Sequence, residues 1–174
     1  MSSVIQVQGL TKKFGHQFTA VNDLSFSVNK GDVYGFLGQN GAGKSTTIRM
    51  LLSLIEPTAG HIEIFGLPLA TNRSAIMKKV GAVIEKPAMY EYLTAFQNLK
   101  IFSALSGVSK TKKQLLHELD VVGLLARAND LVRTFSQGMK QRLAIAMAMV
   151  NDPELILLDE PTNGLDPQGI ADIR

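Results

Sequence analysis

Apolar and polar residues alternate in two stretches near the N-terminus, Val4 to Val7 and Leu24 to Val28. Alternation places every second side chain on one face, so both stretches are predicted to be half-buried strands of an antiparallel sheet. His61 to Phe65 is a further predicted strand, and Val80 to Glu85 is a short buried one. We predict that Gly66 to Arg73, which separates these two strands, forms a loop.

The second half of the chain has a helical pattern. Thr94 is predicted to cap a helix that ends at Gly107, because a glutamine follows the threonine at the third position and glycine suits a helix end. Further helices are expected over Thr111 to Val122 and Ser136 to Val150. Leu155 to Leu158 is then an uninterrupted apolar run, which is typical of a parallel strand buried on both faces.

Strands therefore come first, helices in the middle and a buried strand late. This order predicts an α/β fold with an N-terminal antiparallel β subdomain and a helical insert over about residues 94–150. Asp166 and Pro167 are expected to cap and start a last helix. A length of 174 residues suits a single domain with its own core, so we treat residues 1–174 as one domain.

Composition narrows the class of protein. Hydrophobic residues at 45% and charged residues at 19% indicate a globular chain. The absence of cysteine excludes disulfides and thiolate metal sites. No secretory signal pattern opens the chain, and no apolar run approaches the ~18 residues of a membrane span, so we expect a soluble protein.

The net charge of +3 is mild, and the densest basic run is Lys110 to Lys113. We interpret this run as a solvated helix start, in which Thr111 and Gln114 form a capping box. The alternative is a nucleic-acid-binding patch. The run has no interleaved aromatic residues, so we expect no nucleic-acid partner.

The most informative motif lies between a predicted strand, Val33 to Leu37, and a predicted helix, Thr46 to Ile55. Here Gly38 to Ser45 reads Gly-Gln-Asn-Gly-Ala-Gly-Lys-Ser, which fits the P-loop pattern G-x-x-x-x-G-K-[ST]. Its glycines let successive amides turn toward an anion, and the helix adds the positive end of its dipole. Lys44 would bind the β- and γ-phosphates, and the Ser45 hydroxyl would bind Mg²⁺.

The alternative for this motif is a glycine turn that happens to precede Lys-Ser. If the motif does bind a nucleotide, its neighbouring residues are expected to contribute contacts. The candidate nucleotide-binding residues here are Val21, Gly38, Gln39, Asn40, Gly41, Ala42, Gly43, Lys44, Ser45 and Thr46.

Two carboxylates, Asp159 and Glu160, follow the late apolar run directly. Ligands of open α/β sheets sit at this carboxyl end of the strands. Asp159 would hold Mg²⁺ through water, and Glu160 would act on the water that attacks the γ-phosphate. Successive strand residues point in opposite directions, which permits two roles. The alternative is an acidic pair that caps the turn at Pro161.

A second anion site is predicted where Phe135-Ser-Gln-Gly-Met-Lys-Gln-Arg142 opens a helix. Ser136, with Gly138 and the free amides of the first turn, could bind a phosphate. One nucleotide in one pocket does not need two such helix starts. The simplest use is a dimer, in which the Ser136 site of each chain meets the nucleotide on the P-loop of the other.

In this order, these residues closely resemble the nucleotide-binding subunit of ABC transporters over the whole chain. The resemblance makes Ser136 to Gln141 the signature sequence and Gly164 to Pro167 the dimer-contacting D-loop. It implies a P-loop ATPase that binds ATP and Mg²⁺ on the cytoplasmic face of the membrane and powers membrane-spanning permease subunits. Lys44, Ser136, Gly138 and Glu160 would then be its catalytic residues. It also implies that Phe14 stacks on adenine, the alternative being a core phenylalanine.

Two departures from the family pattern point to a subgroup. Glu85 stands where the family usually has a glutamine that touches Mg²⁺ and senses the membrane partner. A carboxylate is the better ligand for a hard cation but cannot donate a hydrogen bond. The signature reads Phe135-Ser-Gln-Gly-Met139 in place of Leu-Ser-Gly-Gly-Gln. Both features resemble the exporters of bacitracin- or lantibiotic-type peptides, with neutral drift as the alternative for Glu85.

The family also has a switch histidine on the strand that follows the acidic pair. That strand lies between the P-loop strand and the strand before Asp159, and this sequence stops before it. We therefore expect a domain that is incomplete at its C-terminus, with a gap in its sheet. Unpaired ladder groups are costly, so we expect the isolated chain to be poorly stable or to pair the gap with another segment.

Lys86 to Leu93 carries apolar and aromatic residues next to the predicted nucleotide site. We interpret it as the docking surface for a coupling helix of the membrane subunit, and packing beneath the helical insert is the alternative. Two other functions share these motifs. A soluble ATPase of DNA repair or ribosomes would carry a second P-loop, a coiled coil or a strongly basic face, which the sequence lacks. A nucleotide-binding module without turnover stays open.

Overall fold

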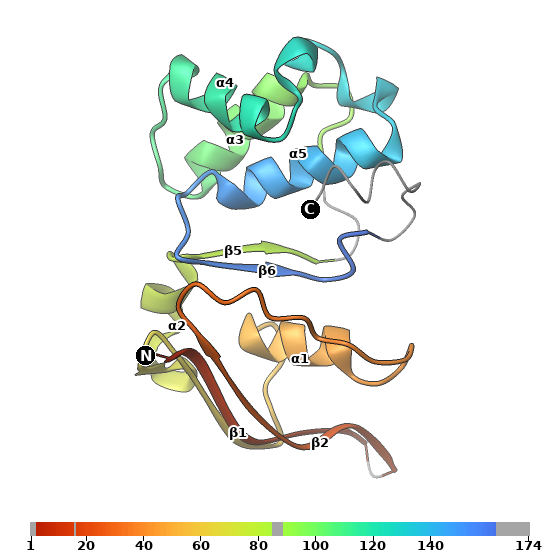
Figure 1. The fold of residues 1–174 in the computed structure, drawn as a ribbon, viewed down its shortest axis with the longest axis vertical. Coiled ribbons are helices and arrows are strands. Elements are labelled where there is room, and N and C mark those ends of the chain that lie inside the picture. The colour runs from red at the N-terminus through yellow and green to blue at the C-terminus, as the bar shows by residue number, and fades with distance from the viewer. Residues whose placement is uncertain (1–2, 16, 85–88, 163–174) are drawn as a thin grey trace. The chain divides into compact units, whose positions relative to one another are not determined.

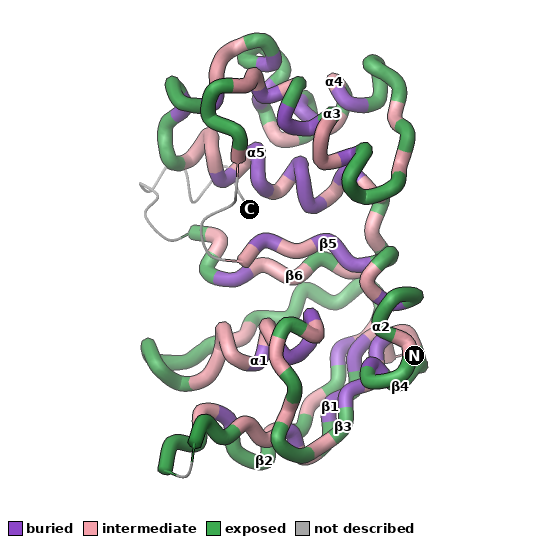
Figure 2. Tube along the Cα trace, turned by 180° about the vertical axis from the view of Figure 1, so that it is seen from behind, coloured by how far each residue is buried: buried purple, intermediate pink, exposed green. Residues whose placement is uncertain are grey.

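The computed structural model describes residues 3–15, 17–84 and 89–162. Within these ranges the chain forms two compact units, one that ends at Met77 and one that begins at Lys78. Each unit has buried apolar residues of its own (Figures 1 and 2).

The first unit contains a four-stranded antiparallel sheet in the order β2-β1-β3-β4. Its strands are β1 (Ser3–Phe14), β2 (Phe18–Asn29), β3 (Ala59–Ile64) and β4 (Leu67–Pro68). The predicted alternation is confirmed in β1, where Ile5 and Val7 are buried while Gln6 between them is exposed. Both predicted N-terminal strands therefore belong to one sheet, in which β1 is central.

Two helices, α1 (Lys44–Leu51) and α2 (Leu69–Met77), complete the first unit. The prediction of a loop over Gly66 to Arg73 is wrong, because β4 and the first turns of α2 occupy it. Leu69 and Ile76, seven residues apart, are both buried and hold α2 to the core. Asn72 interrupts the helix with a non-helical backbone (φ −121°, ψ 21°), so the helical geometry is irregular within the segment predicted to be a loop.

The segment from Val33 to Leu37 is not a strand, which corrects the prediction made from its apolar residues. Val33 and Leu37 are almost completely exposed, and no described residue pairs with the segment in a β-ladder. Its Tyr34 ring stacks on Phe26 of β2 with the centroids 5.5 Å apart. Apolar residues give a strand propensity, but a strand also needs a partner for its backbone groups.

The second unit is built on two parallel strands that pair from Val80↔Leu155 to Val83↔Leu158. Its elements are β5 (Val80–Val83), α3 (Ala95–Leu105), α4 (Lys112–Val121), η1 (Leu125–Arg127), η2 (Val132–Thr134), α5 (Gln137–Met149) and β6 (Leu155–Leu158). Thr94 and Thr111 form the predicted capping boxes with Gln97 and Gln114. No helix in the described ranges combines the length and apolar character needed to cross a membrane.

Helix α5 lies between the β5–β6 pair and the helices α3 and α4 (Figure 1). On one side, Leu143 and Ala146 pack into the helical cluster, and on the other side Ala144 and Ala148 pack against β5. The contact is close at Gly81, where a Cβ atom would lie 2.2 Å from the carbonyl oxygen of Ala148. Packing on two sides explains why the residues of α5 after Gln137 are all buried or partly buried (Figure 2).

Strand β6 confirms the predicted parallel pairing, but the prediction that it is buried on both faces is wrong. In the described part of the chain β6 pairs with β5 alone, and Ile156 is 39% exposed. An uninterrupted apolar run indicates that both faces of a strand are suited to burial. Whether they are buried depends on the elements that pack against them.

Candidate functional site

The predicted phosphate loop folds back on itself in the first unit. The Ala42 amide donates to the carbonyl oxygen of Gln39 at 3.1 Å. The Lys44 ammonium donates to the carbonyl oxygens of Gly38 at 2.8 Å and Gln39 at 3.0 Å. Lys44 is thus held by hydrogen bonds to two carbonyl oxygens of the loop. The oxygens of a bound phosphate could replace these acceptors.

Helix α1 starts at Lys44 directly after Gly43, which has a left-handed backbone with φ +86°. A Cβ atom at Gly43 would lie 2.3 Å from the Ala20 carbonyl oxygen of β2, so only glycine allows this approach. No side chain caps the start of α1. The amides of the first turn, including those of Ser45 and Thr46, therefore remain available to an anion at the positive end of the helix.

The end of the β1–β2 hairpin carries an aromatic surface in the same unit. Phe14 is 46% exposed, which excludes the core-phenylalanine alternative, and its ring stacks on Phe18 with the centroids 6.4 Å apart. The ammonium of Lys12 lies 5.2 Å from the centre of the Phe14 ring. Sequence reasoning missed Phe18; the signal was a second aromatic residue across a short turn from Phe14. Val21, further along β2, is buried against Gly43.

Helix α5 of the second unit presents the predicted signature residues at its start. Ser136 is the N-cap, and its hydroxyl oxygen accepts a hydrogen bond from the Met139 amide at 3.3 Å. The side chain before it, Phe135, is buried in the helical core and anchors the turn. Ser136 itself is exposed, and Gly138 in the first turn is partly exposed. The turn is therefore accessible to a partner, although the serine also caps its own helix.

The acidic pair stands at the carboxyl end of β6, as predicted. Asp159 is buried to 7% exposure, and its amide donates to the Val83 carbonyl oxygen at 2.9 Å, so the ladder with β5 continues to this residue. Glu160 is exposed and has a left-handed backbone with φ +47°. The chain therefore changes direction between the two carboxylates, which separates a buried acid from an exposed one.

Residues 89–93 form an ordered loop whose aromatic residues face outward. Tyr90 is 51% and Tyr92 is 80% exposed, so packing beneath the helical insert does not account for either. Asn98 of α3 is fully buried and fixes the loop, because its carbonyl oxygen accepts from the Tyr90 amide and its NH₂ group donates to the carbonyl oxygens of Tyr90 and Thr94. Met89 does pack against the core, in agreement with the alternative at that one position.

This loop is also tied to the signature helix. The Lys140 ammonium of α5 lies 2.6 Å from a carboxylate oxygen of Glu91. The Arg133 amide donates to the Glu91 carbonyl oxygen at 2.9 Å, and the Arg133 guanidinium lies 5.9 Å from the centre of the Tyr92 ring. Three parts of the predictions lie outside the described residues: Glu85, the first three residues of the predicted docking surface (86–88) and the Gly164–Pro167 segment.

The described groups suit a magnesium-bound polyphosphate. The first unit supplies an uncapped helix start, a lysine and a hydroxyl, and the second supplies a buried carboxylate at a strand end. Hydroxyl and carboxylate oxygens are the ligands that Mg²⁺ prefers. The Ser45 hydroxyl in the first unit and the Asp159 carboxylate in the second are each, by their chemistry, suitable ligands for such a metal.

Comparison with known proteins matches residues 21–163 to the family described as ABC transporter. The bacitracin transport ATP-binding protein BcrA of Bacillus licheniformis is 51% identical over 174 residues, which cover 100% of this chain and 56% of that protein. The lantibiotic transport ATP-binding protein SrtF of Streptococcus pyogenes is 40% identical over 171 residues, covering 98% of this chain and 72% of that protein. The chain therefore spans about half the length of BcrA.

A solved structure described as the ATP binding subunit of an ABC transporter is similar in three dimensions. Its TM-score is 0.82 and its sequence is 33% identical. The alignment covers 98% of this chain and 71% of the solved chain. The similarity extends over both units, so the α/β P-loop fold predicted from the motifs is confirmed.

Proposed function

The chain belongs to the ABC transporter family, and on that basis we propose that it binds ATP with Mg²⁺ and hydrolyses it to power membrane subunits. The observation that carries the proposal is the phosphate loop. Its helix start is uncapped, and the Lys44 ammonium donates hydrogen bonds to two loop carbonyl oxygens that phosphate oxygens could replace. The close approach of Gly43 to β2 fixes the point at which the helix starts, which suits a loop that must present its amides in one place.

On the binding side, the first-turn amides of α1 would hold the phosphates, with Gly38 to Gly43 curled around them. Lys44 would exchange its two carbonyl partners for oxygens of the β- and γ-phosphates. Phe14 would stack on the adenine, and Phe18 would support its ring from behind. Val21 would pack beneath the loop that holds the phosphates.

On the catalytic side, Glu160 would orient and polarise the water that attacks the γ-phosphate. Its exposure and its turned backbone suit contact with a ligand, whereas the buried Asp159 suits a fixed metal-binding role. Ser45 and Asp159 would hold Mg²⁺, with Glu85 as a third candidate. When bound, the metal supplies positive charge that offsets the charge of the phosphate oxygens.

We further propose that two copies, or this chain and a paired ATPase subunit, assemble around ATP. The exposed Ser136 and the partly exposed Gly138 would complete the site of the opposing chain, where their helix start adds positive potential at the γ-phosphate. Turnover would then be slow or absent in a monomer. The expected concentration dependence of specific activity is a direct check of this assembly.

The membrane partner would dock on the loop that exposes Tyr90 and Tyr92, at the cytoplasmic face of the membrane. Exposed aromatic side chains on a loop fixed from below by Asn98 are the type of anchor found at protein interfaces. The names of BcrA and SrtF support export of a bacitracin- or lantibiotic-type peptide as the transported class. Increased resistance to such a peptide in cells that express the intact transporter would test that class.

The proposed activity is tested by Glu160→Gln in the intact protein. We expect the affinity for ATP to stay within about threefold while phosphate release falls by about 10²–10⁴-fold, because the amide cannot act on the water. The control is Glu154→Gln, the same change at the other end of β6, where the glutamate is exposed and pairs with Lys79.

Undiminished phosphate release by Glu160→Gln would contradict the role of Glu160. ATP binding without turnover by the unmodified protein, measured with its partners present, would favour the nucleotide-binding module instead.

A further inference from the structure

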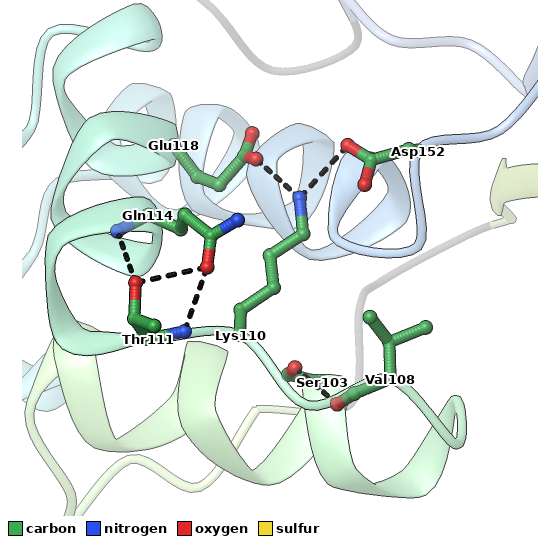
Figure 3. A network of polar contacts seen from close by, with 7 residues as sticks. All are labelled: Ser103, Val108, Lys110, Thr111, Gln114, Glu118 and Asp152. Atoms are coloured by element: carbon green, nitrogen blue, oxygen red, sulfur yellow. Dashed lines mark hydrogen bonds and ion pairs between the residues drawn. The ribbon is translucent and has the colours of Figure 1, made fainter.

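An ion triad in the second unit links the α3–α4 connection to the connection between α5 and β6 (Figure 3). The Lys110 ammonium lies 2.6 Å from a carboxylate oxygen of Glu118 on α4 and 2.8 Å from one of Asp152. The Lys110 side chain is only 5% exposed, so the prediction of a solvated lysine is wrong at this position. Lys112 and Lys113, which follow it, are exposed as predicted.

The triad holds a charge in a buried position. Burial of the ammonium would lower the pKa of Lys110, but hydrogen bonds with Asp152 and Glu118, and the charges of both carboxylates, outweigh it and raise that pKa. Lys110 therefore keeps its charge throughout the neutral pH range. Both of its partners would be left without their counter-ion if the lysine were replaced by an apolar residue.

The segment that carries Lys110 is fixed on both sides. The Ser103 hydroxyl of α3 donates to the Val108 carbonyl oxygen at 2.7 Å, and the Val108 amide donates back to the Ser103 carbonyl oxygen at 3.0 Å. Immediately after Lys110, Thr111 and Gln114 close the capping box that starts α4. Lys110 thus projects from a rigid backbone rather than from a free loop.

The other end of the link leads directly to the acidic pair. Asp152 has a left-handed backbone with φ +52°, and its amide donates to the Met149 carbonyl oxygen at the end of α5. Two residues later, the Glu154 amide donates to the Lys79 carbonyl oxygen before β5. Strand β6 then runs from Leu155 to Leu158 and delivers Asp159. Asp152 is thus connected to the predicted metal ligand through this one short strand.

We propose that Lys110 is a positioning residue, which joins the α3–α4 hairpin to the start of β6 and so sets where Asp159 and Glu160 stand. The inference rests on the proposed function, since it assigns Lys110 a role in hydrolysis. Catalytic groups need placement to a fraction of an ångström, and a mobile β6 would lose it. We refer to the contact of Lys110 with Glu118 and Asp152 as the Lys110 latch.

The test compares matched variants of the intact protein. Asp152→Asn removes one charge from a mostly exposed side chain, and Lys110→Met removes the ammonium. The controls are Asp120→Asn on the exposed face of α4 and Lys112→Met at its start. We expect the first two variants to lower kcat per folded molecule by about tenfold, with the KM for ATP within about twofold. Lys110→Arg should retain at least about half of the activity, because it keeps the charge.

A purely structural role would lower the folded fraction in a thermal scan but leave kcat per folded molecule unchanged, and this result would overturn the proposal. If Lys110→Met does not fold, the kcat of Asp152→Asn per folded molecule decides between a positioning role and a purely structural role. If the unmodified protein shows no turnover, the proposed function is contradicted. In that case the role of Lys110 is tested by hydrogen exchange instead. Faster exchange of the β6 amides in Asp152→Asn than in Asp120→Asn would support it, and equal exchange would overturn it.

Discussion

The two units carry their candidate functional groups in different ways. In the first unit the phosphate loop is made mainly of backbone, and the loop-closing bonds of Ala42 and Lys44 join residues at most six positions apart. In the second unit the candidate groups, Ser136, Asp159 and Glu160, are side chains at the ends of elements. Their positions depend on α5 packing between a sheet and two helices.

The difference shows which of these two sets of groups can be predicted from a short stretch of sequence. A backbone cradle needs glycines and a lysine at fixed spacing, so its motif is local. A strand-end carboxylate needs distant partners. Val83, for example, holds the Asp159 amide from 76 positions away in sequence, and Lys110 holds Asp152 from 42 positions away. The candidate groups of the two units should therefore respond differently to substitution.

Gly43→Ala should have the largest effect on the first unit. The new Cβ would meet the Ala20 carbonyl oxygen at 2.3 Å, and the residue would keep an unfavourable φ of +86°. We expect the affinity for ATP to fall by about 100-fold, since the loss of hydrogen bonds to charged phosphates is worth about 3 kcal/mol. Calorimetric titration measures this. Gly31→Ala is the control, because its φ is also positive (+88°), a Cβ atom there meets nothing within 4 Å, and it lies outside the phosphate loop.

Gly81→Ala should destabilise the second unit by about 2–4 kcal/mol, because its Cβ would press on the Ala148 carbonyl oxygen of α5 at 2.2 Å. Chemical denaturation gives the free energy of unfolding. Gly35→Ala, where a Cβ meets nothing within 4 Å, should stay within about 0.5 kcal/mol of the unmodified protein. Equal effects at both glycines would show that the close packing of α5 on β5 is not needed.

Phe14→Ala tests the aromatic end of the β1–β2 hairpin. Stacking on a base is worth about 1–3 kcal/mol, so we expect about a tenfold weaker affinity for ATP with little change in stability, because Phe14 is 46% exposed. Phe18→Ala should weaken binding less, since Phe18 supports the Phe14 ring rather than the base. Phe14→Tyr keeps a stacking ring and should bind normally. Unchanged affinity in Phe14→Ala would remove Phe14 from the site.

The smallest effect is the pH dependence of the Lys110 latch. Its folded pKa is raised above the ordinary lysine value of 10.5, so its stabilisation is present below that pH and is lost as the pH rises through the folded pKa. The difference in free energy of unfolding between the unmodified protein and Lys110→Met should therefore shrink above about pH 10.5. Lys110→Arg, whose guanidinium stays charged, should keep its advantage over Lys110→Met at higher pH.

The sequence predicted most of the elements but not the surroundings of the candidate residues, and it missed Phe18. Alternation identified β1, and the threonine–glutamine pairs identified the starts of α3 and α4. The prediction of a strand over Val33 to Leu37 was wrong, because strand propensity does not reveal whether a partner strand is present. Prediction from the sequence also failed at α2, where turn-forming residues hid the buried Leu69 and Ile76.

By itself, the sequence determined the phosphate loop, the order of the family motifs and the capped helix starts, because each depends on residues a few positions apart. Only the tertiary structure decided that Phe18 stacks on Phe14, that Asn98 fixes the aromatic loop and that Lys110 is buried between two carboxylates. These contacts arise when separate elements pack together, and a charge or a ring carries no local sign of what will cover it.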